Sequence, residues 1–186
     1  MAVQVRYGMV GGSMDAFIGE VHRKAIGFDP RVELVAGSFS TNAERNQTTG
    51  QTYALDPQRV YTTFQEMAAA ESQRSDGIDF VSITTPNHTH YAIAKCFLEH
   101  GIHVVCEKPL SFTVEEAQEL AALAKEKELL FAVTYTYSGY TMVKVMREMI
   151  AQGKIGEIAA IHAEYAQEWL IDELGTADEG TAKLSI

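Results

Sequence analysis

Two short polar segments hold most of the side chains in this sequence that could do chemistry. The first, residues 84–90, contains Thr, Asn and His and follows the strand-like run 80–83; the second, Glu107-Lys108-Pro109, follows the strand-like run 103–106. Ligands bind outside the carboxyl ends of the strands in an open α/β sheet, so we expect both segments to border one crevice. Each has a plainer interpretation, a turn with a helix cap for the first and a solvated lysine for the second.

A third segment, residues 11–19, has the composition of a turn that binds a phosphate. Gly11 fits the tight turn after a strand, and Gly19 fits the position where a helix packs on that strand. Ser13 stands where a second glycine is usual, and a negative charge at Asp15 would oppose a pyrophosphate by about 1 kcal/mol or more if desolvated. Phosphate binding is the favoured interpretation, and a simple tight turn is the alternative.

The rest of the chain alternates between strand-like and helix-like segments. We expect strands at residues 3–10, 32–37, 60–61, 80–83, 103–106 and 129–134. Helices are expected at 17–28, after a cap at Thr41 or Asn42, after Thr63, at 90–100, and after the capping box that begins at Thr113. Repeated βα units of this kind indicate a parallel, doubly wound sheet with helices on both faces.

The pattern changes after about residue 140. A helix through Ile150 is expected to end at Gln152-Gly153, where the glycine supplies the cap. The run from Ile158 to Tyr165 predicts a strand of eight residues, which has no partner strand in the chain and should therefore be disordered or pair with a second copy. The acidic stretch after Trp169 is expected to be a loop or a disordered tail.

Composition excludes several classes of function. A net charge of −10 argues against nucleic acid and against an anionic membrane as partners, and no run approaches the roughly 18 apolar residues of a membrane span. Cys96 and Cys106 lack CxxC spacing and are expected to be reduced thiols of a cytoplasmic protein. His88 and His90 are two residues apart without further ligands at a suitable spacing, so no metal site is expected.

Four segments, residues 6–12, 19–22, 85–90 and 107–109, resemble in order and spacing those of the Gfo/Idh/MocA family. This family contains the glucose–fructose oxidoreductase and inositol dehydrogenase group of NAD(P)-dependent oxidoreductases. The resemblance covers residues 3–169 and implies an α/β fold, a Rossmann-type doubly wound parallel sheet with the beginning of a second α/β domain. Residues 1–140 would be the NAD(P)-binding domain, and 141–186 the linking helix and first strand of an incomplete substrate and dimerisation domain.

The resemblance also implies roles for individual residues. Lys108 is the implied catalytic residue, which reaches the substrate hydroxyl. Ser38 and Ser40 would lie by the adenosine ribose of the cofactor, NAD or NADP. The full set of implied cofactor-binding residues is Gly11, Gly12, Ser13, Phe17, Ile18, Gly19, Ser38, Ser40, Thr85, Pro86, Asn87, His90, Glu107 and Lys108.

The expected function is that of an oxidoreductase that transfers a hydride between the nicotinamide and a small sugar, cyclitol or related polyol, in a homo-oligomer. The family's usual base, a His four residues after an Asp, does not occur in the second part of this sequence, and His162 has no Asp at that spacing. The alternative is therefore a truncated, non-catalytic Rossmann remnant that acts as a nucleotide-binding or interaction module. The absence of an acidic residue after Gly37 disfavours a strict NAD preference, and Arg45 could hold a 2′-phosphate.

Overall fold

The computed structural model describes residues 4–166. Five parallel strands form one sheet in the order β2-β1-β3-β4-β5. The strands are β1 (Val5–Gly11), β2 (Val32–Ser38), β3 (Phe80–Thr84), β4 (His103–Cys106) and β5 (Phe131–Val133). The predicted α/β class and the parallel sheet are confirmed.

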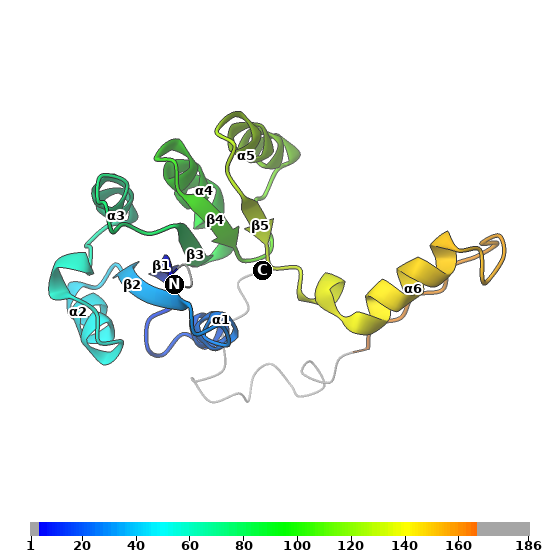
Figure 1. Cartoon of the computed structure of the whole chain (residues 1–186), viewed down its shortest axis with the longest axis horizontal. Coiled ribbons are helices and arrows are strands. Elements are labelled where there is room, and N and C mark those ends of the chain that lie inside the picture. The colour runs from blue at the N-terminus through cyan, green and yellow to red at the C-terminus, as the bar shows by residue number, and fades with distance from the viewer. Residues whose placement is uncertain (1–3, 167–186) are drawn as a thin grey trace, which may run out of the picture. The chain divides into compact units, whose positions relative to one another are not determined.

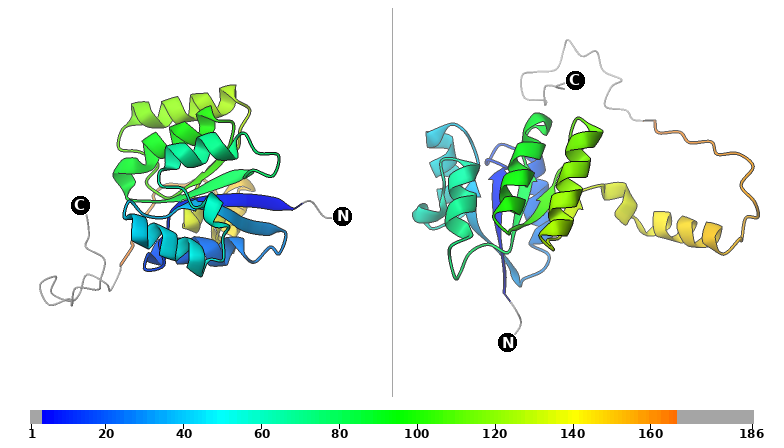
Figure 2. Two further views of the ribbon diagram at one scale, coloured as in Figure 1. Left: turned by 90° about the vertical axis from the view of Figure 1, so that its left-hand side faces the viewer. Right: turned by 90° about the horizontal axis from the view of Figure 1, so that it is seen from above.

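Helices cover both faces of this sheet. Helices α3, α4 and α5 lie side by side on one face, and α1 and α2 lie on the other (Figures 1 and 2). The helices of this unit are α1 (Phe17–Ile26), α2 (Ala43–Thr52), α3 (Phe64–Glu71), α4 (His90–Glu99) and α5 (Val114–Glu126), with short 3₁₀ turns η1 (Pro57–Arg59), η2 (Asn87–Thr89) and η3 (Thr136–Gly139). The expected strand at 60–61 is reduced to a single bridge between Val60 and Gly37 of β2.

Side-chain caps begin three of these helices, as the sequence predicts. Asn42, Thr63 and Thr113 each accept a hydrogen bond from the backbone N–H three residues further on. Such a bond satisfies one of the donors that the first turn of a helix leaves unpaired. The local sequence therefore determines where α2, α3 and α5 begin.

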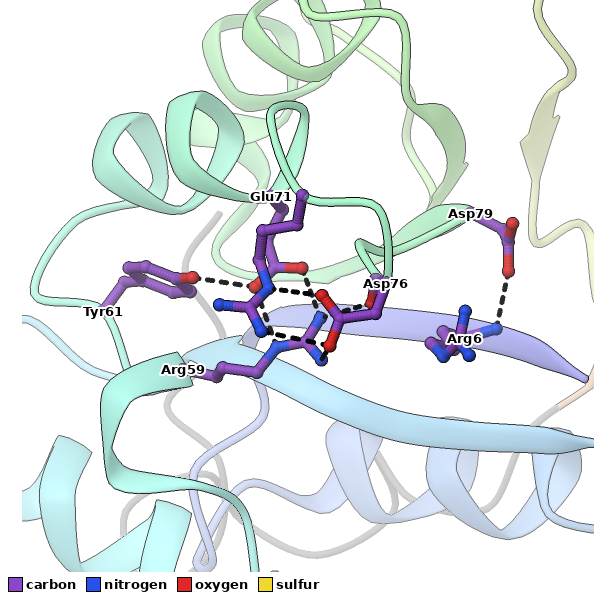
Figure 3. A network of polar contacts seen from close by, with 7 residues as sticks. Arg6, Arg59, Tyr61, Glu71, Asp76 and Asp79 are labelled. Carbon is purple, nitrogen blue, oxygen red and sulfur yellow. Dashed lines mark hydrogen bonds and ion pairs between the residues drawn. The ribbon is translucent and has the colours of Figure 1, made fainter.

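A buried ion pair secures the connection between η1, α3 and the loop before β3 (Figure 3). The Nε of Arg59 donates to Glu71 Oε1 at 3.0 Å, and a second guanidinium nitrogen donates to the other carboxylate oxygen. The Tyr61 hydroxyl donates to Glu71 Oε1 at 2.7 Å, and the Asp76 carboxylate lies 3.8 Å from the guanidinium. Burial, together with the bond to Glu71, raises the pKa of Tyr61 to about 12. The buried guanidinium of Arg59 and the buried carboxylate of Glu71 therefore compensate each other's charge.

The chain divides between Gly139 and Tyr140 into two compact units. The second contains α6 (Thr141–Ala151), which is capped at Gln152 and followed by Gly153 with a φ of 67°, as expected. The prediction of a strand from Ile158 to Tyr165 is wrong, because these residues are exposed and have no regular secondary structure. A strand needs a neighbour for its backbone N–H and C=O groups, and the described chain offers none.

The expectations for the acidic stretch and for membrane spans can be compared only with residues 4–166. The acidic stretch after Trp169 lies outside residues 4–166. Within those residues, no helix has both the length and the apolar character needed to cross a membrane.

Candidate functional site

The carboxyl ends of the strands bring the three polar segments to one edge of the sheet. Gly11 of β1 pairs in register with Thr84 of β3, and Ile83 pairs with Cys106 of β4. The glycine turn, the segment after Thr84 and the segment after Cys106 therefore leave the sheet at neighbouring positions. The chain passes from β1 to β2 on one side and to β3 on the other, and the resulting crevice is where open α/β sheets bind their ligands.

The glycine turn is built by close backbone contacts. Gly11 and Gly12 have φ values of 80° and 70°, a left-handed conformation that side chains disfavour. A Cβ atom on Gly19 would lie 2.3 Å from the Cα of Gly12, and one on Gly12 would lie 2.5 Å from the Met9 sulfur. Helix α1 thus touches the turn through two glycines, which is the packing role that the sequence predicts for Gly19.

The start of α1 is open to an anion. Its N-cap residue, Ala16, makes no side-chain cap, in contrast to the caps of α2, α3 and α5. The first N–H groups of α1 and the positive end of its dipole therefore remain available. Ser13 is buried and its carbonyl accepts the Ala16 N–H at 2.7 Å, whereas Asp15 is exposed to solvent. These features fit the pyrophosphate of a dinucleotide.

The adjoining side chains of α1 are Phe17, which is 80% exposed, and Ile18, which is partly buried. The turn is also held by Tyr53, which follows α2. Its hydroxyl donates to the Gly12 carbonyl at 3.1 Å, and the Arg23 guanidinium lies 3.9 Å from its ring centre. Tyr53 was not predicted from the sequence, because a tyrosine after a helix has no local feature that marks such a contact.

The end of β2 is fixed onto α2. Ser38 is buried and pairs in register with Val10, and the hydroxyl of Ser40 accepts the Asn42 N–H at 3.1 Å. Between them, the Phe39 N–H donates to the Asn46 side chain at 2.7 Å. Ser38 therefore lies one strand from the glycine turn, at the same edge of the sheet. Its contact with a ribose, and that of Ser40, stay predictions.

The segment after β3 exposes Pro86 and Asn87 and half-buries Thr85. His90 is fully buried, with Nε2 2.9 Å from the Thr85 carbonyl oxygen and Nδ1 2.7 Å from the Pro109 carbonyl oxygen. The ring thus joins the two polar segments that the sequence places at one crevice. The role of His90 in cofactor binding stays a prediction, and its ring is turned to the interior.

The segment after β4 combines a buried carboxylate with an exposed amine. Glu107 is 8% exposed, and Lys108 is exposed. Burial by itself would raise the pKa of the Glu107 carboxyl, but hydrogen bonds from His22 and Thr134 outweigh it, so the pKa lies below its ordinary value. The carboxylate is therefore ionised at neutral pH, and it accepts the backbone N–H of Lys108 at 3.1 Å.

From the sequence, His22 was assigned no role in the site and belongs only to the segment 19–22. The structure places it at the centre of a buried polar chain between Ser82 and Glu107. The available signal was its position three residues after Gly19, on the inward face of α1.

Residues 4–166 contain two free thiols and no metal-binding cluster of side chains. Among residues 4–166 no group of three or more His, Cys, Asp or Glu side chains could hold a metal ion. Cys96 and Cys106 are free thiols, and burial raises the pKa of Cys106 to about 12, which keeps it protonated.

Comparison with known proteins identifies the family of this chain. Residues 5–135 match the Gfo/Idh/MocA group, described as an oxidoreductase family with an NAD-binding Rossmann fold. The chain belongs to this family. Its glycine turn and uncapped α1 are thus parts of an NAD-binding Rossmann domain, and the resemblance proposed from the motifs is confirmed.

Relatives of known structure and sequence agree with this assignment. An inositol dehydrogenase homologue from Azotobacter vinelandii, solved with NADH and myo-inositol, is 42% identical with a TM-score of 0.79 over 84% of this chain and 41% of its own. The oxidoreductase YfiI of Bacillus subtilis is 42% identical over 90% of this chain and 47% of its own length. The 1,5-anhydro-D-fructose reductase of Ensifer adhaerens is 31% identical over 86% of this chain and 46% of its own. The chain thus spans about half the length of these relatives.

Proposed function

We propose that the whole protein to which this domain belongs transfers a hydride between NAD or NADP and a hydroxyl-bearing carbon of a sugar, cyclitol or related polyol. The observation that carries this proposal is the position of Lys108. It is an exposed amine at the carboxyl end of β4, on the sheet edge shared with the glycine turn and Asn87. The myo-inositol bound to the Azotobacter homologue and the activity named for the Ensifer reductase support this substrate class.

The residues of the site would divide the work as follows. The first turn of α1, with Gly12 and Ser13, would bind the pyrophosphate, and Ser38 would lie by the adenosine ribose. The nicotinamide, when bound, supplies the hydride acceptor or donor. The ammonium group of Lys108 would donate a hydrogen bond to the substrate oxygen and stabilise the negative charge that develops there as its proton leaves.

The division of the chain is part of the same proposal. Residues 1–140 would hold the cofactor, and residues 141–186 would begin the domain that binds the substrate and joins two copies. The break between compact units at Gly139 supports this boundary.

Fluorescence titration of NADH and NADPH into the chain tests the cofactor part of the proposal. We expect saturable binding of at least one of them. Lys108→Met in the whole protein should then lower kcat for its polyol by about 100-fold with little change in NADH affinity. Lys125→Met, a change at an exposed lysine of α5, is the matched control and should have no effect.

The titration also separates the alternatives. Cofactor binding without turnover of any polyol by the whole protein would favour a nucleotide-binding module. Absence of binding would favour an interaction module. Equal loss of NADH binding and turnover in Lys108→Met would show that the lysine serves the cofactor and not the substrate.

A further inference from the structure

We propose that His22 is a positioning residue that holds Lys108 in place through Glu107, so that the pyrophosphate-binding helix also orients the catalytic lysine. This inference rests on the proposed role of Lys108. It concerns a residue of α1 that lies behind the crevice and does not itself reach the substrate. His22 is linked to Lys108 only through Glu107, which is bonded to the His22 ring and to the Lys108 backbone.

The first step is the placement of the imidazole. His22 is 7% exposed, and its ring crosses from α1 to two strands. Nδ1 lies 2.8 Å from the Ser82 hydroxyl of β3, and Nε2 lies 3.0 Å from Oε1 of Glu107, directly after β4. Because both ring nitrogens have partners on different strands, the ring has one orientation.

The second step is the direction of these hydrogen bonds. The ionised Glu107 carboxylate can only accept hydrogen bonds. Nε2 of His22 must therefore carry a proton and donate a hydrogen bond to it. The Ser82 hydroxyl can then donate to the unprotonated Nδ1. A neutral imidazole with its proton on Nε2 satisfies all three groups without an additional buried charge.

The third step leads from the carboxylate to the lysine. Oε1 of Glu107 accepts from His22 and, at 2.6 Å, from the Thr134 hydroxyl. This leaves Oε2 to accept the backbone N–H of Lys108 at 3.1 Å. Each oxygen of the carboxylate thus has its own donors, and its rotation would break the bond to Lys108. Without the donor on His22, the buried carboxylate loses a hydrogen bond that opposes such rotation.

Amide variants of His22 distinguish a positioning role from one in which the histidine only fills space in the core. The ring's two nitrogens can be imitated separately by amide side chains. In His22→Gln the terminal amide reaches the place of Nε2 and can donate to Glu107. In His22→Asn the amide reaches only the place of Nδ1, next to Ser82. The two variants carry the same chemical group and differ by one methylene.

The test uses the whole 186-residue chain with its lysines reductively methylated with ¹³C. The Lys108 resonance is the one that is lost in Lys108→Arg. We expect His22→Gln to keep this resonance at its wild-type position and His22→Asn to shift it by more than its linewidth. A Gln variant shifted as far as the Asn variant, or an Asn variant that is not shifted, would overturn the proposal.

A second measurement, made on the wild-type chain, tests the hydrogen bond from His22 to Glu107 even if His22→Asn does not fold. The ¹⁵N spectrum of the histidine rings in the wild-type chain reports which nitrogen of His22 carries the proton. We expect a proton on Nε2 that exchanges slowly with solvent. A neutral ring protonated on Nδ1 could not donate to Glu107 and would refute the assignment.

NADH titration of the same samples keeps this test apart from that of the proposed function. Failure of the wild-type chain to bind either cofactor would count against the proposed function. The Lys108 resonance and the His22 proton would still report whether His22 positions the lysine.

Discussion

Replacing Gly19 with alanine tests whether α1 must touch the glycine turn. The added Cβ would lie 2.3 Å from the Cα of Gly12 and 3.1 and 3.2 Å from its carbonyl carbon and oxygen. Ordinary contacts of a Cβ begin at 3.4 Å, so helix and turn must separate by about 1 Å. The obstacle is backbone on both sides, and no flexible side chain can move away to relieve it.

The structure sets the size of the expected effect. Overpacking of this kind costs about 1–3 kcal/mol. The alanine recovers about 0.5–1 kcal/mol, because glycine is unfavourable within a helix. We therefore expect the free energy of unfolding to fall by about 1 kcal/mol. The affinity for NADH should fall by about tenfold or more, because the N–H groups that face the pyrophosphate move away from their positions.

Equilibrium unfolding in urea and fluorescence titration with NADH measure the two effects. Gly139→Ala is the matched control, because a Cβ there meets nothing within 4 Å and Gly139 does not have a positive φ. The control should change neither quantity. A Gly19→Ala chain that binds NADH as tightly as the wild type would refute the reasoning that this contact shapes the phosphate site.

Three further predictions concern charge and ionisation. Glu71→Gln should lower the free energy of unfolding in urea by about 3 kcal/mol, since it removes the buried one of the two carboxylates that face Arg59. Asp76→Asn removes the half-exposed carboxylate and should cost less than about 1 kcal/mol; equal costs would contradict this reasoning. Burial raises the pKa of Tyr7 from 10 to about 12, so its contribution to stability is present below pH 10 and lost as the pH rises to 12. Tyr7→Phe should therefore reduce the alkaline loss of stability by about 2–3 kcal/mol, measured by unfolding across that range, and an unaltered profile would argue against it. Asp15→Asn should tighten NADH binding about twofold at low salt and much less at high salt, because the carboxylate is exposed and screened; a salt-independent effect would indicate direct contact.

Local patterns in the sequence were sufficient for most elements of the fold. The starts of α2, α3 and α5 were predictable, since Asn42, Thr63 and Thr113 cap groups only three residues away. The glycine turn was predictable for the same reason, because left-handed φ values at Gly11 and Gly12 are a property of the residues themselves.

Elements that depend on distant partners were predicted less well. The run from Ile158 to Tyr165 has the alternation of a strand, but it has no neighbouring strand in the described chain and is irregular in the structure. The strand expected at 60–61 forms only one bridge, between Val60 and Gly37 of β2. Alternation shows that a strand is possible, and pairing decides whether it exists.

By itself, the sequence determined the α/β class, the family, and the three segments that meet at the carboxyl edge of the sheet. Only the tertiary structure decided which buried side chains hold those segments. His22 meets Ser82 and Glu107 across 60 and 85 residues, and Tyr53 meets Gly12 across 41. Such contacts arise from the register of parallel strands and the packing of helices on them, and no spacing in the sequence encodes them.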